Sequence, residues 1–151
     1  MAYRMACQSA DLIAGVASLA GPTFLDRSLC VPSEPVNILH IYGSADQTAT
    51  YWGGAGPMVG SLNGTPDPGA VRSVQIWAGY NGAHDPVTDP ARTLDLTLDV
   101  PGLDTVVTRY TQHPPGGAVK LWTIEGGVHV PTISSQFSPC VIDWLFAHPK
   151  P

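Results

Sequence analysis

The chain has few cations and no cluster of them. Its 151 residues include 7 lysines and arginines against 12 aspartates and glutamates, which gives a formal net charge of −5. Only 13% of the residues are charged. Proteins that bind nucleic acid through its phosphate backbone need basic patches or stripes. The composition therefore excludes that class, and we expect no nucleic-acid partner.

Long hydrophobic runs are also missing. No apolar stretch approaches the ~20 residues that a membrane-spanning helix needs, so we expect no membrane contact. The first residues do not combine a charged segment with an apolar one, so we expect no signal peptide within this chain. Apolar residues are nevertheless 44% of the total, and 151 residues suffice for a single domain with its own core.

Cysteine is scarce. The three cysteines, Cys7, Cys30 and Cys140, do not have the spacing of a zinc site. One of them has no partner if a disulfide forms, and the alternative is that all three are small buried hydrophobic residues. Glycine (16) and proline (15) are abundant between apolar runs, which predicts long irregular loops rather than disorder.

The apolar pattern predicts strands and helices in alternation. The clearest strand lies within residues 35–46, where Val36, Ile38, Leu39 and Ile41 form the nearly continuous apolar run of a strand buried in a parallel sheet. It should end at Gly43. We expect further strands at residues 14–19, 104–111 and 118–126, and helices at residues 2–12, 67–81 and 138–148.

Residues that typically begin or end helices and strands refine this prediction. The helix at 67–81 has Asp67 before Pro68 at its start and Gly82 at its end. Lys120 suits an edge strand. Residues 47–66, which include Met58, form a long loop, and residues 83–102 form another with a short ribbon at 94–98. The alternation favours an α/β fold with a mainly parallel sheet flanked by helices.

Two polar residues follow predicted strands. Asp46 comes after the strand that ends at Gly43, and His129 comes after the strand at 118–126. Parallel sheets bind ligands beyond the carboxyl ends of their strands. A carboxylate that holds one imidazole nitrogen leaves the other free to act as a base. The alternative is structural: Asp46 caps a turn, and His129 bonds a loop carbonyl.

Several longer stretches carry a resemblance. "MAYRMAC", "PVNILHIYGSADQTATYWGG", "IWAGYNG", "VTRYTQHPPGGAVKLWTIEGGVHVP" and "VIDWLFAH" resemble the polyhydroxybutyrate depolymerase-like and feruloyl esterase-like α/β-hydrolases, in the right order and over nearly the whole chain. The resemblance implies that Asp46 is the catalytic acid and His129 the base. Val128 and Val130 depart from that family's glycine and tryptophan around the histidine.

The same resemblance implies a missing nucleophile. In that family a serine elbow precedes the "MAYR" helix, so this chain corresponds to a C-terminal part, truncated just after the elbow. We expect a carboxylic ester hydrolase for short-chain or aromatic esters, weakly active or atypical in route, with no cofactor and no metal. Ser44 is a candidate nucleophile, and a water activated by His129 is the alternative.

Other roles follow from the resemblance. Tyr51 and Trp52 line the ester pocket or else pack their loop down. Cys7 and Cys30 match positions that are paired in relatives, which predicts a disulfide between them, whereas Cys140 has no evident partner. The family is often secreted. The remaining histidines have structural interpretations: His40 as a satisfied core residue, and His84, His113 and His148 as surface or loop residues.

Half of such a fold would expose a sheet edge at residues 14–19 and apolar faces beside it, so we expect a homodimer. Three hypotheses for function follow. The chain is a weak or atypical ester hydrolase, a non-catalytic fragment or binding module, or a half-enzyme that needs a partner chain to supply the serine.

Overall fold

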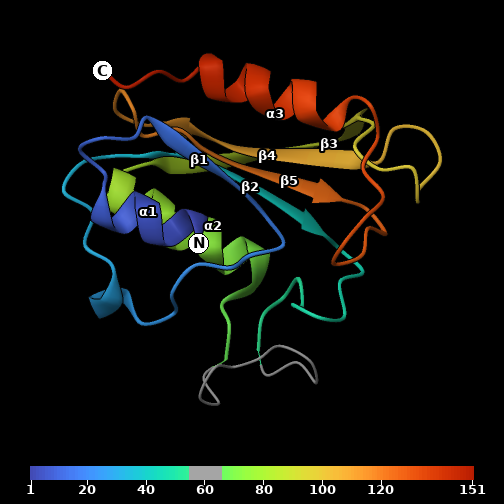
Figure 1. Ribbon diagram of the computed structural model, residues 1–151, viewed down its shortest axis with the longest axis horizontal. Coiled ribbons are helices and arrows are strands. Elements are labelled where there is room, and N and C mark those ends of the chain that lie inside the picture. Colours follow the sequence, from blue (N-terminus) through green and yellow to red (C-terminus); the bar gives the residue numbers. More distant parts are fainter. Residues whose placement is uncertain (55–65) are drawn as a thin grey trace.

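The computed structural model describes residues 1–54 and 66–151 and has a central sheet between two layers of helices (Figure 1). The strands are β1 (Gly15–Leu19), β2 (Asn37–Gly43), β3 (His84–Leu94), β4 (Thr105–Gln112) and β5 (Val119–Ile124). The α-helices are α1 (Ala2–Gln8), α2 (Gly69–Asn81) and α3 (Phe137–Phe146), and a short 3-10 helix spans Arg27–Leu29. The class is α/β, as expected.

The sheet is mixed rather than mainly parallel. Its order is β1-β2-β5-β4-β3, with β1 and β3 at the two edges. The pairs β1–β2 and β2–β5 are parallel, whereas β4–β5 and β3–β4 are antiparallel. The expectation of a mainly parallel sheet was wrong because β4 runs opposite to both of its neighbours, β5 and β3, so two of the four strand pairs are antiparallel.

The hydrophobic core has two layers, one on each face of the sheet. On one face, α1 and α2 pack against alternate residues of β2 and β5, and the layer includes Tyr3, Trp77, Ile38 and Leu121. On the other face, α3 contributes Trp144 to a cluster with Leu39, Ile41, Trp122 and Ile124. Figure 1 shows α3 above the sheet and the other two helices below it. All seven residues of β2 are buried, which explains its nearly continuous apolar run.

Three predicted elements need correction. The first helix ends at Gln8 instead of continuing to residue 12. Residues 84–94, expected as loop, form the 11-residue strand β3. The strand β5, expected at an edge because of Lys120, lies in the middle of the sheet. Lys120 is about half-buried, and its pKa is lowered by burial and by nearby Arg109.

Local chemistry sets the ends of α2. The carboxylate of Asp67 accepts a hydrogen bond of 2.7 Å from Gly69 N–H, which satisfies one free donor of the first turn. At the other end Gly82 adopts a left-handed conformation with φ of 64°, a conformation that glycine adopts without a steric penalty. Part of the long loop before α2, including Met58, lies outside the described residues.

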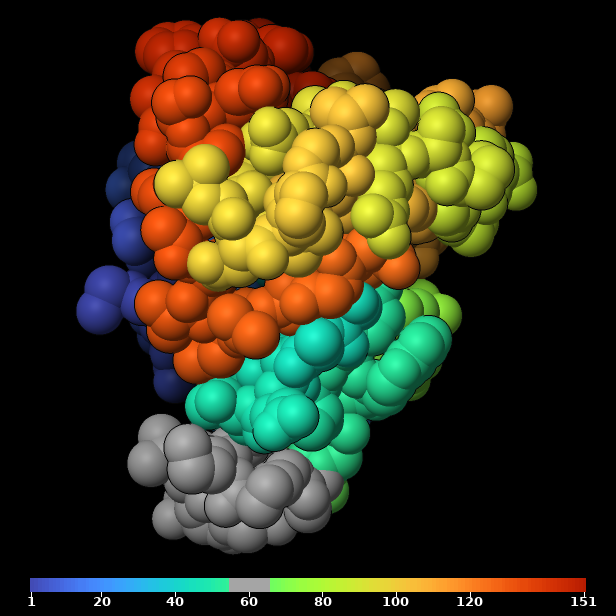
Figure 2. Space-filling model, turned by 90° about the vertical axis from the view of Figure 1, so that its right-hand side faces the viewer, coloured from blue at the N-terminus to red at the C-terminus, as the bar shows by residue number. Residues whose placement is uncertain are grey.

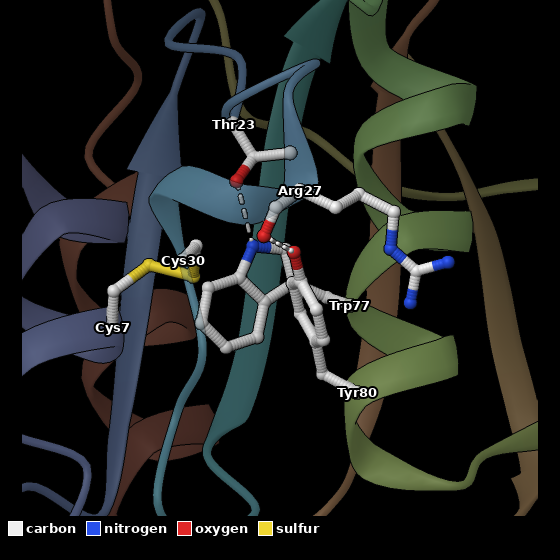
Figure 3. Close-up of a disulfide and its surroundings, with 6 residues drawn as sticks. All are labelled: Cys7, Thr23, Arg27, Cys30, Trp77 and Tyr80. Carbon is white, nitrogen blue, oxygen red and sulfur yellow. Dashed lines mark hydrogen bonds between the residues drawn. A yellow bond between two sulfur atoms is a disulfide. The ribbon is translucent and has the colours of Figure 1, made fainter.

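A disulfide fastens the connection between β1 and β2. It joins Cys7 of α1 to Cys30, and Figure 3 shows it beside the contacts that hold the same connection to α2. The indole N–H of Trp77 donates to Thr23 Oγ1 at 2.9 Å, and the Arg27 guanidinium lies over the Tyr80 ring at 5.0 Å. Such a bridge typically stabilises a fold by about 2–4 kcal/mol. Cys140, on α3, forms no disulfide within the described chain.

In the part of the chain that the structure describes, no helix is both long enough and apolar enough to cross a membrane.

Candidate functional site

Two turns meet at the carboxyl ends of β2 and β5. The N–H of Ser44 donates to Ile124 O at 2.9 Å, and that of Ala45 donates to Gly127 O at 3.0 Å. In return, Gly126 N–H donates to Ser44 Oγ at 2.8 Å. Figure 2 looks onto this edge, where the orange segment after β5 lies between the teal turn after β2 and the yellow segment before β4. The parallel pairing of β2 with β5 therefore continues into the turns.

Glycine is required where the two turns touch. A Cβ atom added to Gly43 would lie 2.2 Å from Gly127 O and 2.8 Å from Val128 O, both of them backbone atoms. A Cβ on Gly127 would lie 2.7 Å from Ile124 Cγ2 and 3.2 Å from Gly43 Cα. The closeness of the two backbones sets the position of the histidine two residues further on.

The structure brings Asp46 and His129 into contact. Oδ2 of Asp46 lies 2.9 Å from Nδ1 of His129. The other oxygen of Asp46, Oδ1, accepts hydrogen bonds from Thr48 N–H at 2.8 Å and Ala49 N–H at 2.9 Å. The Asp46 side chain is fully buried, whereas the His129 side chain is 37% exposed. The carboxylate is thus held from behind by its own loop and presents one oxygen to the imidazole.

Two further acidic groups lie near the Asp46 carboxylate. Burial raises the pKa of the Tyr42 hydroxyl, and the carboxylates of Asp67 and Asp46 raise it further. Burial also raises the pKa of Asp67, with a smaller contribution from Asp46. Burial is thus the main cause of both rises in pKa, and the hydrogen bond from Gly69 N–H opposes part of the rise at Asp67.

The exposed side of His129 faces a small open hollow. It has a volume of about 500 Å³ and is lined by Ala45, Gln47, Thr48, Val128, His129 and Val130. None of these side chains carries a fixed charge. Among the described residues, no group of three or more His, Cys, Asp or Glu side chains could hold a metal ion. The hollow therefore places one imidazole among uncharged side chains.

The other predicted site residues lie apart from this hollow. Ser44 uses its Oγ to accept from Gly126, as described above, and not to contact His129. Tyr51 is buried, donates to or accepts from Thr123 Oγ1 at 2.8 Å, and lines a different groove of about 410 Å³ beside α2. Trp52 is 81% exposed, and its ring meets that of Tyr51 edge-on. Neither aromatic residue lines the hollow at His129.

The remaining histidines have no place in the site. His40 is fully buried in β2, its Nδ1 lies 2.7 Å from the Tyr3 hydroxyl, and burial lowers its pKa to about 3. Its Nε2 finds no partner among the described residues, so only one nitrogen is satisfied. His84 pairs with Asp85, His113 contacts the Pro114 carbonyl, and His148 contacts the Trp144 carbonyl.

Sequence reasoning missed one buried carboxylate near the site. Asp104 is fully buried just before β4, and its carboxylate accepts from the N–H groups of Leu96 and Thr97. A single aspartate at the start of a predicted strand gives no local pattern by which it could be found. Its significance depends on where the chain folds back, which only the structure shows.

Comparison with known proteins gives a relative with a described function. A protein described as "Putative esterase NocK", from Nocardia uniformis subsp. tsuyamanensis, is 28% identical to this chain over 150 residues. This chain has an esterase-like relative. The match covers 94% of the chain but 42% of the relative, so the chain spans less than half the length of that protein. No family model and no solved structure matches the chain.

Proposed function

We propose that this chain carries the acid–base half of an ester hydrolase, with His129 as the base and Asp46 as the residue that orients it. The observation that carries the proposal is the contact of 2.9 Å between His129 Nδ1 and a buried oxygen of Asp46. This contact fixes the tautomer with the proton on Nδ1, so the lone pair of Nε2 is available as a base. The esterase-like relative supports the same chemistry.

The proton path follows from this arrangement. Nε2 accepts the proton of a hydroxyl as its oxygen attacks the ester carbonyl carbon, and a tetrahedral intermediate forms. The imidazolium then gives that proton to the departing alkoxide oxygen, which breaks the ester bond and releases the alcohol. Asp46 stays ionised throughout and stabilises the imidazolium by its charge.

The pair of Asp46 and His129 does not itself supply the hydroxyl that attacks the ester. Ser44 is held by Gly126 N–H, so we propose water as the nucleophile for this chain alone. Without a nucleophilic serine, only a small part of the rate of a full triad is expected. A serine elbow of the polyhydroxybutyrate depolymerase-like or feruloyl esterase-like kind, in a longer chain or in a partner chain, would complete the triad.

The walls of the hollow suggest the substrate. Val128 and Val130 are 46% and 79% exposed beside the imidazole, and no described side chain there is charged. Uncharged, short-chain or aromatic esters fit such walls better than charged ones, and no cofactor is required. The unpaired edge of β1 also supports a homodimer, which sedimentation would register as twice the mass of the chain.

Hydrolysis of p-nitrophenyl acetate tests the proposed base. We expect the wild type to exceed the buffer rate, and His129→Ala and Asp46→Asn to match it, because the first removes the base and the second removes the charge that orients it. His84→Ala is the matched control, because this histidine is exposed and pairs only with its neighbour Asp85. It should keep the wild-type rate.

Two results would count against the proposal in different ways. Wild-type protein that matches the buffer blank would refute catalysis by this chain and favour a binding module or a half-enzyme. A serine-directed phosphonate that labels the chain and abolishes turnover would refute the water mechanism but keep the hydrolase.

A further inference from the structure

The carboxylate of Asp104 is the centre of a buried set of hydrogen bonds. Oδ2 accepts from Leu96 N–H at 3.0 Å and from Thr97 N–H at 2.8 Å. Oδ1 accepts from the hydroxyl of the next residue, Thr105. Asp104 itself is fully buried. Hydrogen bonds to an ionised acceptor are stronger than neutral ones, so Asp104 fixes the backbone of residues 96–97 firmly.

That fixed backbone in turn holds the chain just after His129. Leu98 N–H donates to Thr132 O at 2.7 Å, and Ser134 N–H donates to Leu96 O at 3.0 Å. The Thr97 hydroxyl also donates to Thr132 O at 3.0 Å. Asp99 adds a second carboxylate, which accepts from Thr132 N–H at 2.6 Å. Three residues beyond the imidazole, the chain is therefore held by a segment that Asp104 orders.

The chain before His129 is attached to the same residue. The N–H of Glu125 donates to the backbone carbonyl of Asp104 at 2.8 Å. The segment from Glu125 to Thr132, which contains His129, thus has one end bonded to Asp104 directly and the other bonded to it through residues 96–99. The turn after β2 has an anchor of its own besides its bonds to the turn after β5, because Asp46 bonds to its own loop.

We propose that Asp104 is a positioning residue that sets the place of His129 against Asp46. The proposal rests on the function proposed above. Its physical basis is that the two partners also have different anchors. Thr48 and Ala49 hold the Asp46 carboxylate, whereas the segment that Asp104 orders holds the chain that follows His129. Loss of the Asp104 carboxylate therefore moves the imidazole and leaves its carboxylate partner in place.

Asp104→Asn tests this with little change in shape. An amide keeps one acceptor oxygen but loses the negative charge, which weakens the hydrogen bonds that the group accepts, so residues 96–97 lose part of their anchor. The matched control is Asp95→Asn in the same segment, since only the backbone carbonyl of Asp95 forms a described contact, with the Ser134 hydroxyl. Asp99→Asn is a second, exposed variant that weakens the contact with Thr132 by removing its charge and leaves the Asp104 carboxylate in place.

The main readout is the proton NMR signal of the His129 Nδ1–H, assigned by its loss in His129→Ala. A proton held between Nδ1 and a buried carboxylate exchanges slowly and resonates at low field. We expect that signal in the wild type and in Asp95→Asn, its loss in Asp104→Asn, and a weakened signal in Asp99→Asn. Hydrolysis should fall roughly tenfold or more in Asp104→Asn, because small displacements of a catalytic base are costly.

The NMR signal separates this proposal from the proposed function. A wild type that shows the signal but hydrolyses no ester refutes the function alone. An Asp104→Asn protein that keeps both its sheet resonances and the His129 signal overturns the positioning role, even if its melting temperature falls. If Asp104→Asn does not fold, Asp99→Asn decides: a signal equal to that of Asp95→Asn overturns the proposal.

Discussion

The parallel half of the sheet (β1, β2 and β5) and the antiparallel hairpin (β3 and β4) differ in burial and in the candidate site residues that follow their strands. In the parallel half, every residue of β2 is buried, with core on both faces. In the hairpin, no residue of β3 is buried, and its pairing with β4 contains register shifts between Asp89 and Leu94. Asp46 and His129 both follow strands of the parallel half. The candidate site is thus built on the part of the sheet whose positions are fixed by packing.

The edge strands of the two halves differ in their content of proline and charged residues. The edge strand β3 contains Pro86 and Pro90 and several charged residues, which blunt it against pairing with another chain. The edge strand β1 is GVASL and has no proline or charge. The hairpin therefore ends the sheet, whereas the parallel half leaves an edge that can accept a further strand.

The largest expected effect comes from Gly43→Ala, at the junction of the two site turns. The new Cβ would lie 2.2 Å from Gly127 O, a backbone atom that can yield only if the turn before His129 moves. We expect a loss of about 3 kcal/mol in unfolding free energy, the upper range for overpacking. Ester hydrolysis should fall to the level of His129→Ala. Chemical denaturation and p-nitrophenyl acetate hydrolysis measure the two effects.

Gly79→Ala is the control for that substitution. Its new Cβ would meet only the far end of the Arg27 side chain, at 3.5 Å, on an ordinary helical backbone. Alanine should raise stability there by about 0.5–1 kcal/mol through helix propensity. Equal effects of the two substitutions would mean that the turns are not closely packed and would remove the contrast between the halves.

Much of the parallel half could be predicted from the sequence because burial leaves a pattern. The apolar run of β2 marked a strand that ends at Gly43, and the residues around α2 marked its limits. Asp46 and His129 could be paired because parallel strands place their carboxyl ends together. In the hairpin, β4 matches the strand predicted at 104–111, but β3 (HDPVTDPARTL) could not be predicted, since it is exposed and so has no apolar alternation to detect.

Two other errors have physical causes. Lys120 suggested an edge strand, but a long side chain can bury its stem in a central strand while its charge stays near solvent. Asp104 was missed because its partners are backbone N–H groups of residues 96 and 97, which every sequence offers. Which backbone N–H groups a carboxylate contacts depends on where the chain folds back, and only the structure shows this.

A second prediction concerns acid stability, to which the parallel half contributes through His40. The folded-state pKa of this buried histidine is about 3, below the usual value of 6.5, so the unfolded state binds the proton more readily. Stability is therefore unaffected above pH ~6.5 and falls by about 1.4 kcal/mol for each pH unit as pH drops from there toward 3. His40→Gln should flatten that part of the curve, measured by denaturant titration at each pH.

The control for this prediction of stability at acid pH is His84→Gln, in the exposed hairpin. Its side chain is 67% exposed, so removal of this histidine should leave the slope of stability against pH as in the wild type. If His40→Gln and wild type lose equal amounts of unfolding free energy between pH 6 and 4, the burial of His40 does not cause the loss of stability at acid pH.

The smallest effect is expected in the hairpin itself. Thr88 and Thr108 face each other across β3 and β4 with their hydroxyl oxygens 2.8 Å apart, at an exposed position. Thr88→Val removes that bond but keeps a β-branched residue suited to a strand, so we expect a change in unfolding free energy within about 0.5 kcal/mol. Ester hydrolysis should stay at the wild-type rate, because none of the hydrogen bonds among the described residues links the Thr88 side chain to the turns that hold Asp46 and His129. A loss above about 1 kcal/mol, or a fall in hydrolysis, would show that the hairpin shares in positioning the site and that the two halves are not independent.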